Sequence, residues 1–349
     1  MVREYEKSIL IILCVLMAIS LAACSNSEVA PYENEEFAMG TIIRQRIYHE
    51  NAEDISKQVI ERIREIEDGM TINKAGGEIN NLNSSAGKGF VQLSKDTLFV
   101  LSKAKEISQL SDGAFDVTIG PLVKEWDLLG ENPEIPLKER IDSLLELVDY
   151  KDITIDKPNT KAKLENKGQI VDLGGIAKGF AGDEAIEVYC ENGVQSAFIS
   201  LGGNIVALGG KTDGSPWKIG IRDPRGSEGS YIGIVSVKDK AVVSSGDYER
   251  FFERNGVRYH HILSPKTGYP ADSGLIGSTI ISDFSIDADA LSTATFVLGL
   301  EKSMALIKKF DGVEAVFVTD DKKVYITEGL KGVFEFEGTG NGYEYVEKG

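Results

Sequence analysis

The hydrophobic pattern of this 349-residue chain changes its period near residue 151, and this change constrains the fold more than any other feature. Residues 52–70 carry apolar side chains three and four positions apart, namely Ile55, Val59, Ile63, Ile66 and Met70. Residues 95–111 repeat this spacing with Leu98, Leu101, Ala104 and Ile107, and a Ser-Asp-Gly sequence ends the pattern. This spacing predicts two amphipathic helices.

Short β-rich runs, separated by Gly, Asp and Pro, dominate after residue 151. Residues 197–201 and 205–208 predict a hairpin across Gly202-Gly203-Asn204, and residues 314–327 predict a second hairpin that turns at Asp320-Asp321. Helices are expected at 178–191 and after residue 286. Since helices come first and strands later, without regular β-α-β alternation, the sequence predicts an α+β fold with mixed or antiparallel sheets and flanking helices.

The N-terminus has the character of a signal peptide. Residues 8–23 are almost wholly apolar and follow Arg3 and Lys7, and this stretch is short for a stable membrane span. The sequence Leu-Ala-Ala-Cys ending at Cys24 resembles a lipobox. We therefore expect residues 1–23 to be removed and Cys24 to be lipidated, which holds the protein at the extracytoplasmic face of the cell membrane. A plain signal anchor with an incidental cysteine is the alternative.

Residues 24–36 are predicted to be a polar tether, and residues 37–340 a single domain. An apolar fraction of 42% and a charged fraction of 27% are typical of a soluble globular protein. The formal net charge is −17, and removing residues 1–23 leaves it unchanged. Such a charge repels nucleic-acid backbones, so no nucleic-acid partner is expected. A polyphosphate ligand therefore needs a local cation or backbone N–H groups.

The sequence Val-Asp-Leu-Gly-Gly-Ile-Ala-Lys-Gly-Phe at 171–180 joins an apolar run to a predicted helix. Lys178 falls in the first helical turn, where a cation is disfavoured by the helix dipole unless an anion lies nearby. Exposed N–H groups and this ammonium could hold a phosphate, with Asp172 just before the glycine pair. A tight turn without a ligand is the alternative.

Asp289, Ser292 and Thr293 share one face of the helix predicted after residue 286. Ligands that are all oxygen suit a hard cation such as Mg²⁺. Zinc fits poorly, because Cys190 is the only unlipidated cysteine expected in the mature chain and the histidines lack ligand spacing. The alternative is a helix N-terminal cap.

Two further stretches carry candidate residues. Residues 259–270 predict a rigid turn after His260 and His261, whose side chains point to opposite faces if both lie on a strand. Residues 111–128 set Phe115 and Asp116 in a Gly-flanked turn before a tryptophan. This second stretch is either a platform for a flat ring or a loop packed on the core.

Together and in this order, eight stretches resemble the ApbE-type FAD:protein FMN transferases. They are MGTII (39–43), SDGAFDVTIGPLV (111–123), VDLGGIAKGF (171–180), ISLGGNIVALG (199–209), WKIGIRDP (217–224), VVSSGDYERFF (242–252), HHILSPKTGYP (260–270) and DADALSTATFVLG (287–299). The resemblance implies one flavin-transferase domain that transfers the FMN part of FAD, with Mg²⁺, to a Thr or Ser hydroxyl of an acceptor flavoprotein and releases AMP. The implied acceptors are flavoprotein subunits of membrane redox or ion-pumping complexes.

The resemblance also implies site residues. The residues that contact FAD would be Met39, Ala114, Phe115, Asp116, Asp172, Lys178, Ile262 and Leu263. The metal ligands would be the main-chain oxygen of Gly175 with Asp289, Ser292 and Thr293. The acceptor hydroxyl must lose a proton, for which His261 is the candidate base and Asp289 its rival. Ser264 departs from the family, which commonly has Asp at this position.

Three other functions stay open at this point. The same site could hydrolyse FAD to FMN and AMP, with water as the acceptor, or the protein could hold FAD without catalysis at the membrane. A solute-binding lipoprotein is disfavoured, because two lobes of alternating strand and helix are not evident in the sequence.

Overall fold

The computed structural model describes residues 30–347 apart from positions 73, 75, 129, 131 and 132. The predicted signal peptide and Cys24 therefore lie outside the described residues. One compact unit begins at Tyr32 and includes every helix and strand described below. Within the described part of the chain, no helix combines the length and the apolar character that a membrane crossing requires.

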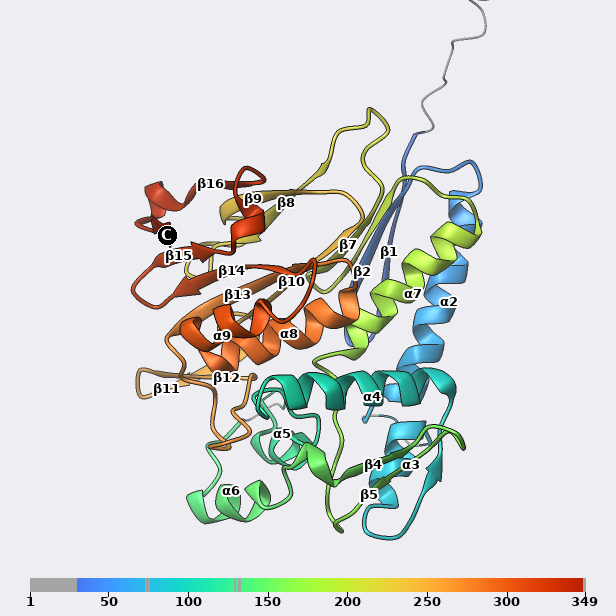
Figure 1. The fold of residues 1–349 in the computed structure, drawn as a ribbon, viewed down its shortest axis with the longest axis vertical. Coiled ribbons are helices and arrows are strands. Elements are labelled where there is room, and N and C mark those ends of the chain that lie inside the picture. The colour runs from blue at the N-terminus through green and yellow to red at the C-terminus, as the bar shows by residue number, and fades with distance from the viewer. Residues whose placement is uncertain (1–29, 73, 75, 129, 131–132, 348–349) are drawn as a thin grey trace, which may run out of the picture. The chain divides into compact units, whose positions relative to one another are not determined.

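A nine-stranded sheet runs through this unit in the order β1-β2-β6-β7-β10-β13-β14-β15-β17 (Figure 1). Neighbouring strands are antiparallel, except that β15 and β17 are parallel. The strands are β1 (Tyr32–Ala38), β2 (Thr41–Ile47), β6 (Ala197–Leu201), β7 (Asn204–Leu208), β10 (Lys240–Gly246), β13 (Leu275–Ser282), β14 (Glu314–Thr319), β15 (Lys323–Ile326) and β17 (Glu344–Val346). The predicted α+β class with mixed sheets is confirmed.

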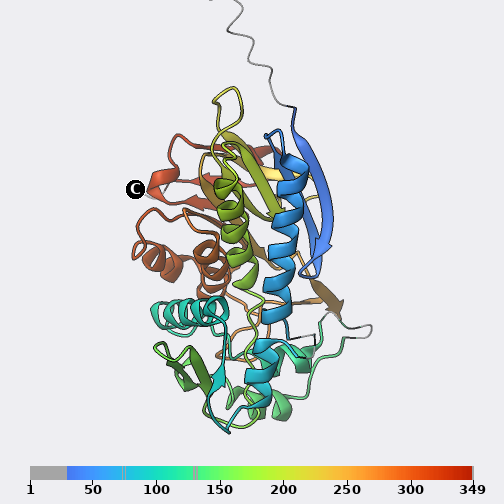
Figure 2. The ribbon, with the colours of Figure 1, turned by 90° about the vertical axis from the view of Figure 1, so that its right-hand side faces the viewer.

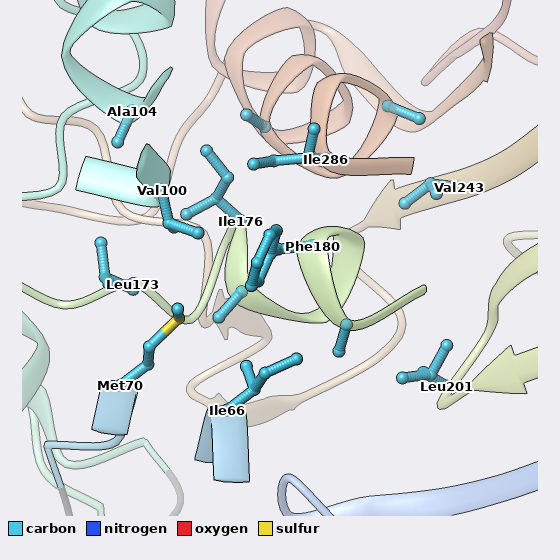
Figure 3. Packing of buried hydrophobic residues seen from close by; sticks show 14 of the residues in the cluster. Ile66, Met70, Val100, Ala104, Leu173, Ile176, Phe180, Leu201, Val243 and Ile286 are labelled. Atoms are coloured by element: carbon cyan, nitrogen blue, oxygen red, sulfur yellow. The ribbon is translucent and has the colours of Figure 1, made fainter. Parts of the chain in front are cut away.

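Helices pack against one another, and all of them except α4 cover one face of this sheet (Figures 1 and 2). They are α2 (Ala52–Met70), α4 (Lys95–Leu110), α7 (Ala177–Glu191), α8 (Ser285–Leu298) and α9 (Leu300–Ile307). Figure 3 shows Phe180 of α7 within the resulting apolar cluster, with Ile66 of α2 on one side and Ile286 of α8 on the other. Helix α8 also lies against β10 and β13, so the centre of the sheet supports it.

A second, smaller sheet in the order β16-β9-β8 covers the opposite face of the nine-stranded sheet. Its strands are β8 (Trp217–Arg222), β9 (Tyr231–Val237) and β16 (Phe334–Phe336). All eight residues of β13 are buried, because Ile280 packs into the helical cluster and Ile281 into the cluster beneath β8 and β9. A strand covered on both faces loses the alternation of apolar and polar residues.

The remaining elements are short. They are α3 (Glu78–Ser84), β3 (Val91–Gln92), α5 (Gly120–Trp126), α6 (Lys138–Leu145), η1 (Tyr150–Asp152), β4 (Ile153–Asp156), β5 (Lys161–Leu164), β11 (Phe251–Arg254), β12 (Val257–His260), η2 (Glu328–Leu330) and η3 (Gly338–Asn341). Helices α5 and α6 enclose a third apolar cluster around Trp126, whose side chain is fully buried. The part of residues 111–128 around Trp126 is therefore a short helix packed on a core.

The predicted helices and hairpins agree with the structure to within a residue or two. The compact unit begins with β1 at Tyr32 rather than at residue 37, and β17 extends it past residue 340. Strand β1 lies at the edge of the sheet and pairs with β2. An edge strand can be polar, and its polar sequence therefore resembles that of a tether. Its charged side chains face solvent and pair across the strands, Glu33 with Arg46 and Glu35 with Arg44.

Candidate active site

The glycine-pair loop leads directly into α7. Asp172 accepts a hydrogen bond from the backbone N–H of Gly174 at 2.8 Å. Burial raises the pKa of Asp172, while the Gly174 N–H and the Lys178 ammonium act in the opposite direction. The Lys178 ammonium donates to the Gly174 carbonyl at 3.2 Å and lies 3.8 Å from Oδ1 of Asp289. The loop thus places a cation beside the carboxylate predicted to bind metal.

Asp289 lies inside α8 and is not its cap. The helix begins at Ser285, so the alternative of an N-terminal cap is wrong. Asp289 is 4% exposed, and its Oδ2 accepts the backbone N–H of Gly179 at 2.8 Å. The first N–H groups of α8 are bound instead by Asp183 of α7. The carboxylate of Asp289 is thereby fixed against the first turn of α7.

Three distant segments meet at Gly175. A methyl group built on Gly175 would lie 3.2 Å from the Phe115 ring and 3.5 Å from Oγ1 of Thr293. Thr293 is partly exposed, whereas Ser292 is fully buried. The Ser292 hydroxyl donates to the Asp289 carbonyl at 2.8 Å and lies 2.7 Å from the hydroxyl of Ser245 on β10. Thr293 therefore lies close to Gly175, and Asp289 lies beside Lys178, while Ser292 faces the sheet.

The chemistry of these donors is that of a hard-cation site. Within the described residues, no group of three or more His, Cys, Asp or Glu side chains is arranged to hold a metal. A cation at Gly175 therefore depends on one carboxylate together with hydroxyl and main-chain oxygens. Such oxygen donors fit Mg²⁺, which keeps several waters and shares its remaining positions with phosphate oxygens.

The two adjacent histidines have different surroundings. His260 ends β12, is 5% exposed, contacts the Ala271 carbonyl through Nε2 at 3.0 Å and packs edge-to-face on Phe296. His261 lies just beyond the strand, and its backbone N–H donates to the Arg250 carbonyl at 3.0 Å. Nδ1 of His261 is buried and has no hydrogen-bond partner among the described residues. Burial, together with Arg250, lowers the pKa of His261 to about 4.

The predicted flavin contacts in residues 114–116 are buried. Ala114 is 3% exposed and Phe115 is 4% exposed. Oδ1 of Asp116 accepts the N–H and the hydroxyl of Thr118, at 2.8 and 2.7 Å, and Oδ2 accepts the Tyr150 N–H at 2.8 Å. Burial raises the pKa of Asp116, and these three hydrogen bonds oppose the shift. The Asp116 carboxylate holds its own loop together, and the Phe115 ring is the part that reaches Gly175.

The other predicted flavin contacts lie in turns. Met39 is half-buried in the turn between β1 and β2, with a φ of 52°. Ile262 and Leu263 are 5% and 6% exposed and pack into two different apolar clusters. Beyond His261 the main chain forms an isolated bridge between Leu263 and Pro270. Because the side chains of Ile262 and Leu263 are buried, a ligand would contact the main chain at these two residues.

Ser264, which stands where the family commonly has Asp, lies in the turn at 264–268. The backbone N–H of Gly268 donates to the Ser264 carbonyl at 2.8 Å, and the Ser264 hydroxyl accepts the N–H of Lys266 at 3.3 Å. An Asp side chain makes the same kind of bond to the backbone two residues on, so Ser264 preserves the turn. Trp126 donates to the Gly268 carbonyl at 2.7 Å and fixes this turn to α5.

Sequence reasoning missed three residues that build the site. Gly179 and Asp183 of α7 hold α8, and Ser245 of β10 binds Ser292. Gly179 and Asp183 are four positions apart and so share a helix face, which is a signal that the sequence contained. Ser245 lies within a stretch that resembled the family, but nothing local indicated its partner.

The chain is similar to known proteins of one family. A model described as "ApbE family" matches residues 39–317. The FAD:protein FMN transferase of Treponema pallidum (strain Nichols) is 35% identical over 338 residues, which covers 92% of this chain and 93% of that protein. The FAD:protein FMN transferase of Klebsiella pneumoniae (strain 342) is 32% identical over 316 residues, which covers 90% and 97% respectively.

Solved structures share the fold. The crystal structure of the ApbE protein from Thermotoga maritima has a TM-score of 0.81 and 34% identity, covering 88% of this chain and 100% of that chain. The flavin transferase ApbE from Vibrio cholerae has a TM-score of 0.78 and 26% identity, covering 86% and 98% respectively.

Proposed function

The chain belongs to the ApbE family and is a transferase that moves FMN from FAD to an acceptor protein, and on this premise we propose how its site performs the transfer. The observation that carries the proposal is the meeting of Phe115, Gly175 and Thr293, which come from three separate segments. The glycine-pair loop, the Phe115 ring and Thr293 of α8 lie close together, which supports a flavin nucleotide site at this point.

In the proposed reaction, a Thr or Ser hydroxyl of the acceptor attacks the phosphorus of the FMN half of FAD. A new P–O bond forms to the acceptor, and the pyrophosphate P–O bond breaks. AMP leaves with the electron pair of that bond, and the hydroxyl proton passes to a base. Catalysis of this kind rests mainly on positioning and on electrostatic stabilisation of the phosphoryl oxygens.

Lys178 is the proposed phosphate contact on the protein side. It lies in the first turn of α7, where the helix dipole also favours an anion. Its ammonium is 3.8 Å from Oδ1 of Asp289, so it can balance that carboxylate or a phosphate oxygen. A chain with a formal net charge of −17 needs such a local cation to hold a pyrophosphate.

Mg²⁺ is the proposed metal, with Asp289, Thr293 and the main-chain oxygen of Gly175 as ligands. Ser292, the fourth ligand expected from the family resemblance, is left out of this set, because its buried hydroxyl bonds to Ser245 and to the Asp289 carbonyl. When bound, the ion supplies Lewis-acid stabilisation of the pyrophosphate oxygens and of the leaving AMP. The Gly179 N–H holds Oδ2 of Asp289, which leaves Oδ1 as the carboxylate oxygen on the side of Lys178.

His261 is the proposed acceptor of the hydroxyl proton. Its pKa of about 4 keeps the imidazole neutral at neutral pH, and no group of the described residues donates to Nδ1. A base must accept a hydrogen bond from the substrate hydroxyl, which Nδ1 can do, and the lowered pKa makes this imidazole a weak base. Asp289 is the rival base, although its carboxylate is already engaged by Gly179.

The proposed acceptors are flavoprotein subunits of membrane redox or ion-pumping complexes. A lipid on Cys24 would hold the transferase at the extracytoplasmic face of the same membrane. Residues 25–31 then separate the anchor from the first strand. Such an arrangement confines enzyme and acceptor to one surface and raises their effective concentration.

The test mixes the protein with FAD, Mg²⁺ and a candidate acceptor and examines denatured acceptor for flavin fluorescence on a gel. Transfer predicts labelled acceptor and one AMP per bound flavin. An acceptor whose target Thr is replaced by Val is the matched control and should stay unlabelled. Free FMN and AMP with unlabelled acceptor would instead establish an FAD pyrophosphatase, and FAD that is bound and unchanged would establish a binding protein.

A further inference from the structure

Helix α8 receives its N-terminal cap from another helix. Asp183 of α7 accepts the backbone N–H of Ser285 at 2.6 Å through Oδ1 and that of Ile286 at 2.9 Å through Oδ2. The residue at the cap position of α8 itself, Phe284, makes no side-chain cap. A helix begins with four N–H groups that lack partners within the helix, so the Asp183 carboxylate binds half of them.

The same turn of α7 touches α8 at a second point. A methyl group on Gly179 would lie 2.7 Å from Cβ of Asp289 and 2.7 Å from Cα of Ile286, closer than atoms can approach. A methyl group on Gly182 would lie 3.0 Å from Oγ of Ser285. The two helices therefore pack backbone against backbone, with Asp183 at one end of the contact and the Gly179–Asp289 hydrogen bond at the other.

Asp183 lies away from the predicted flavin and metal residues. It lines a cavity of about 660 Å³ between α4, α7 and α8, whose walls include Phe99, Lys103, Glu184 and Asp287. No residue predicted to contact FAD or metal lines this cavity. Burial raises the pKa of Asp183 to about 7, the N–H groups of Ile286 and Ser285 oppose this shift, and Asp287 and Glu184 add to it. Asp183 is thus an acid at a position where burial disfavours its charged form, and such a buried acid is expected to have a specific role.

We propose that Asp183 is a positioning residue of the transferase, which sets the place of Asp289 and Thr293 against the Gly175–Lys178 loop by capping α8. It does not touch substrate. Asp289 lies one helical turn beyond the capped residues, so a shift or fraying of the first turn of α8 moves its carboxylate relative to Gly175. This inference rests on the proposed function, since it assigns the consequence of the cap to cation binding.

The test compares Asp183→Ala with Glu184→Gln. Glu184 is the matched control, because it is the adjacent acid on α7 and pairs with Arg62 rather than with α8. We expect Asp183→Ala to raise the Mg²⁺ concentration for half-maximal transfer at least about tenfold, with turnover at saturating Mg²⁺ near the wild-type value. Glu184→Gln should leave both values unchanged. Amide hydrogen exchange at 285–289 should accelerate only in Asp183→Ala.

A second-site change tests the mechanism of the effect. Phe284 is 61% exposed and has the extended backbone of a cap position, so Phe284→Ser can supply a local cap. The double variant Asp183→Ala/Phe284→Ser should recover much of the Mg²⁺ affinity and of the exchange protection. A purely structural loss would lower the amount of folded protein without changing the Mg²⁺ requirement of the folded fraction.

A folded Asp183→Ala protein with the wild-type Mg²⁺ requirement would overturn the proposal. If that variant does not fold, Asp183→Asn decides the question, because it keeps one acceptor oxygen and should show a smaller rise. An unchanged requirement in Asp183→Asn would likewise overturn the proposal. Should the wild-type chain transfer no FMN, the proposed function fails separately, and calorimetric titration of Mg²⁺ into the FAD-loaded proteins then tests Asp183 by the same comparison.

Discussion

Gly179 donates its backbone N–H to Oδ2 of Asp289 at 2.8 Å, although the two residues are 110 positions apart. One residue belongs to the first turn of α7 and the other to the second turn of α8. The bond occupies one oxygen of the only carboxylate among the predicted metal ligands and leaves the other on the side of Lys178, 3.8 Å away. The Asp289 side chain therefore takes part both in the packing of α7 on α8 and in the proposed metal binding.

Asp289→Asn and Asp289→Ala should separate these two roles. Asparagine keeps an oxygen for the Gly179 N–H but loses the charge, so we expect transfer to fall at least about 100-fold while the melting temperature changes little. Alanine also leaves the buried N–H of Gly179 without a partner, which costs about 1–3 kcal/mol of folding free energy. Transfer rates and thermal unfolding of both variants check this, and wild-type transfer by Asp289→Asn would place the metal elsewhere.

Gly179→Ala should destabilise the fold, although alanine normally favours a helix by about 1 kcal/mol over glycine. The added methyl group would force α7 and α8 apart, and overpacking of this kind costs about 1–3 kcal/mol. Gly69 of α2 is the matched control, since a methyl group there meets only Oγ1 of Thr97 at 3.6 Å. Urea unfolding should therefore show a loss for Gly179→Ala and no loss for Gly69→Ala. Equal effects would contradict the close crossing of α7 and α8.

His261 should make the stability of the folded protein depend on pH between about 4 and 6.5. Because the folded-state pKa is lowered from 6.5 to about 4, the unfolded chain takes up the proton first as the pH falls. The contribution of neutral His261 to stability is complete above about pH 6.5 and is lost as the pH falls through about 4. Unfolding measured from pH 4 to 7 should show a shallower pH slope in His261→Ala than in the wild type.

The same variant tests the proposed base. We expect His261→Ala to slow transfer by about 10²–10⁴-fold with FAD binding retained, and no limb near pH 6.5 in the wild-type rate. His260→Ala should instead lower the melting temperature, because His260 packs on Phe296 in the core, and the activity of its folded fraction should stay near wild type. If His261→Ala lost FAD affinity but kept its turnover at saturating FAD, His261 would be a flavin contact.

Cys24→Ser should release the protein from the membrane. The predicted lipid is attached to this side chain, and the compact unit begins only at Tyr32, so the soluble activity should stay unchanged. Fractionation of cells and mass spectrometry of the N-terminus check the expectation. Wild-type protein that carries no lipid on Cys24 in its normal host would refute it.

The sequence by itself determined the elements whose signal is local. Helix α2 was predicted with the bounds that the structure has, because apolar residues at helical spacing bury one face wherever the helix packs. The hairpin of β6 and β7 was predicted as well, since a glycine pair between two apolar runs specifies a tight turn. The family-like stretches also predicted Gly175, Asp289 and Thr293 as site residues; the structure places Thr293 close to Gly175, and Asp289 beside Lys178.

Features that depend on a covering layer or a distant partner were decided only by the tertiary structure. The composition of β1 is polar like that of a tether, and it does not reveal that the strand pairs with β2 at the edge of the sheet. The same holds for His261, whose pKa is lowered by burial when the chain folds. It also holds for the cap of α8, because Asp183 lies about a hundred residues before Ser285 and Ile286. Desolvation and long-range hydrogen bonds arise only when the chain has packed, so no local pattern of residues can reveal them.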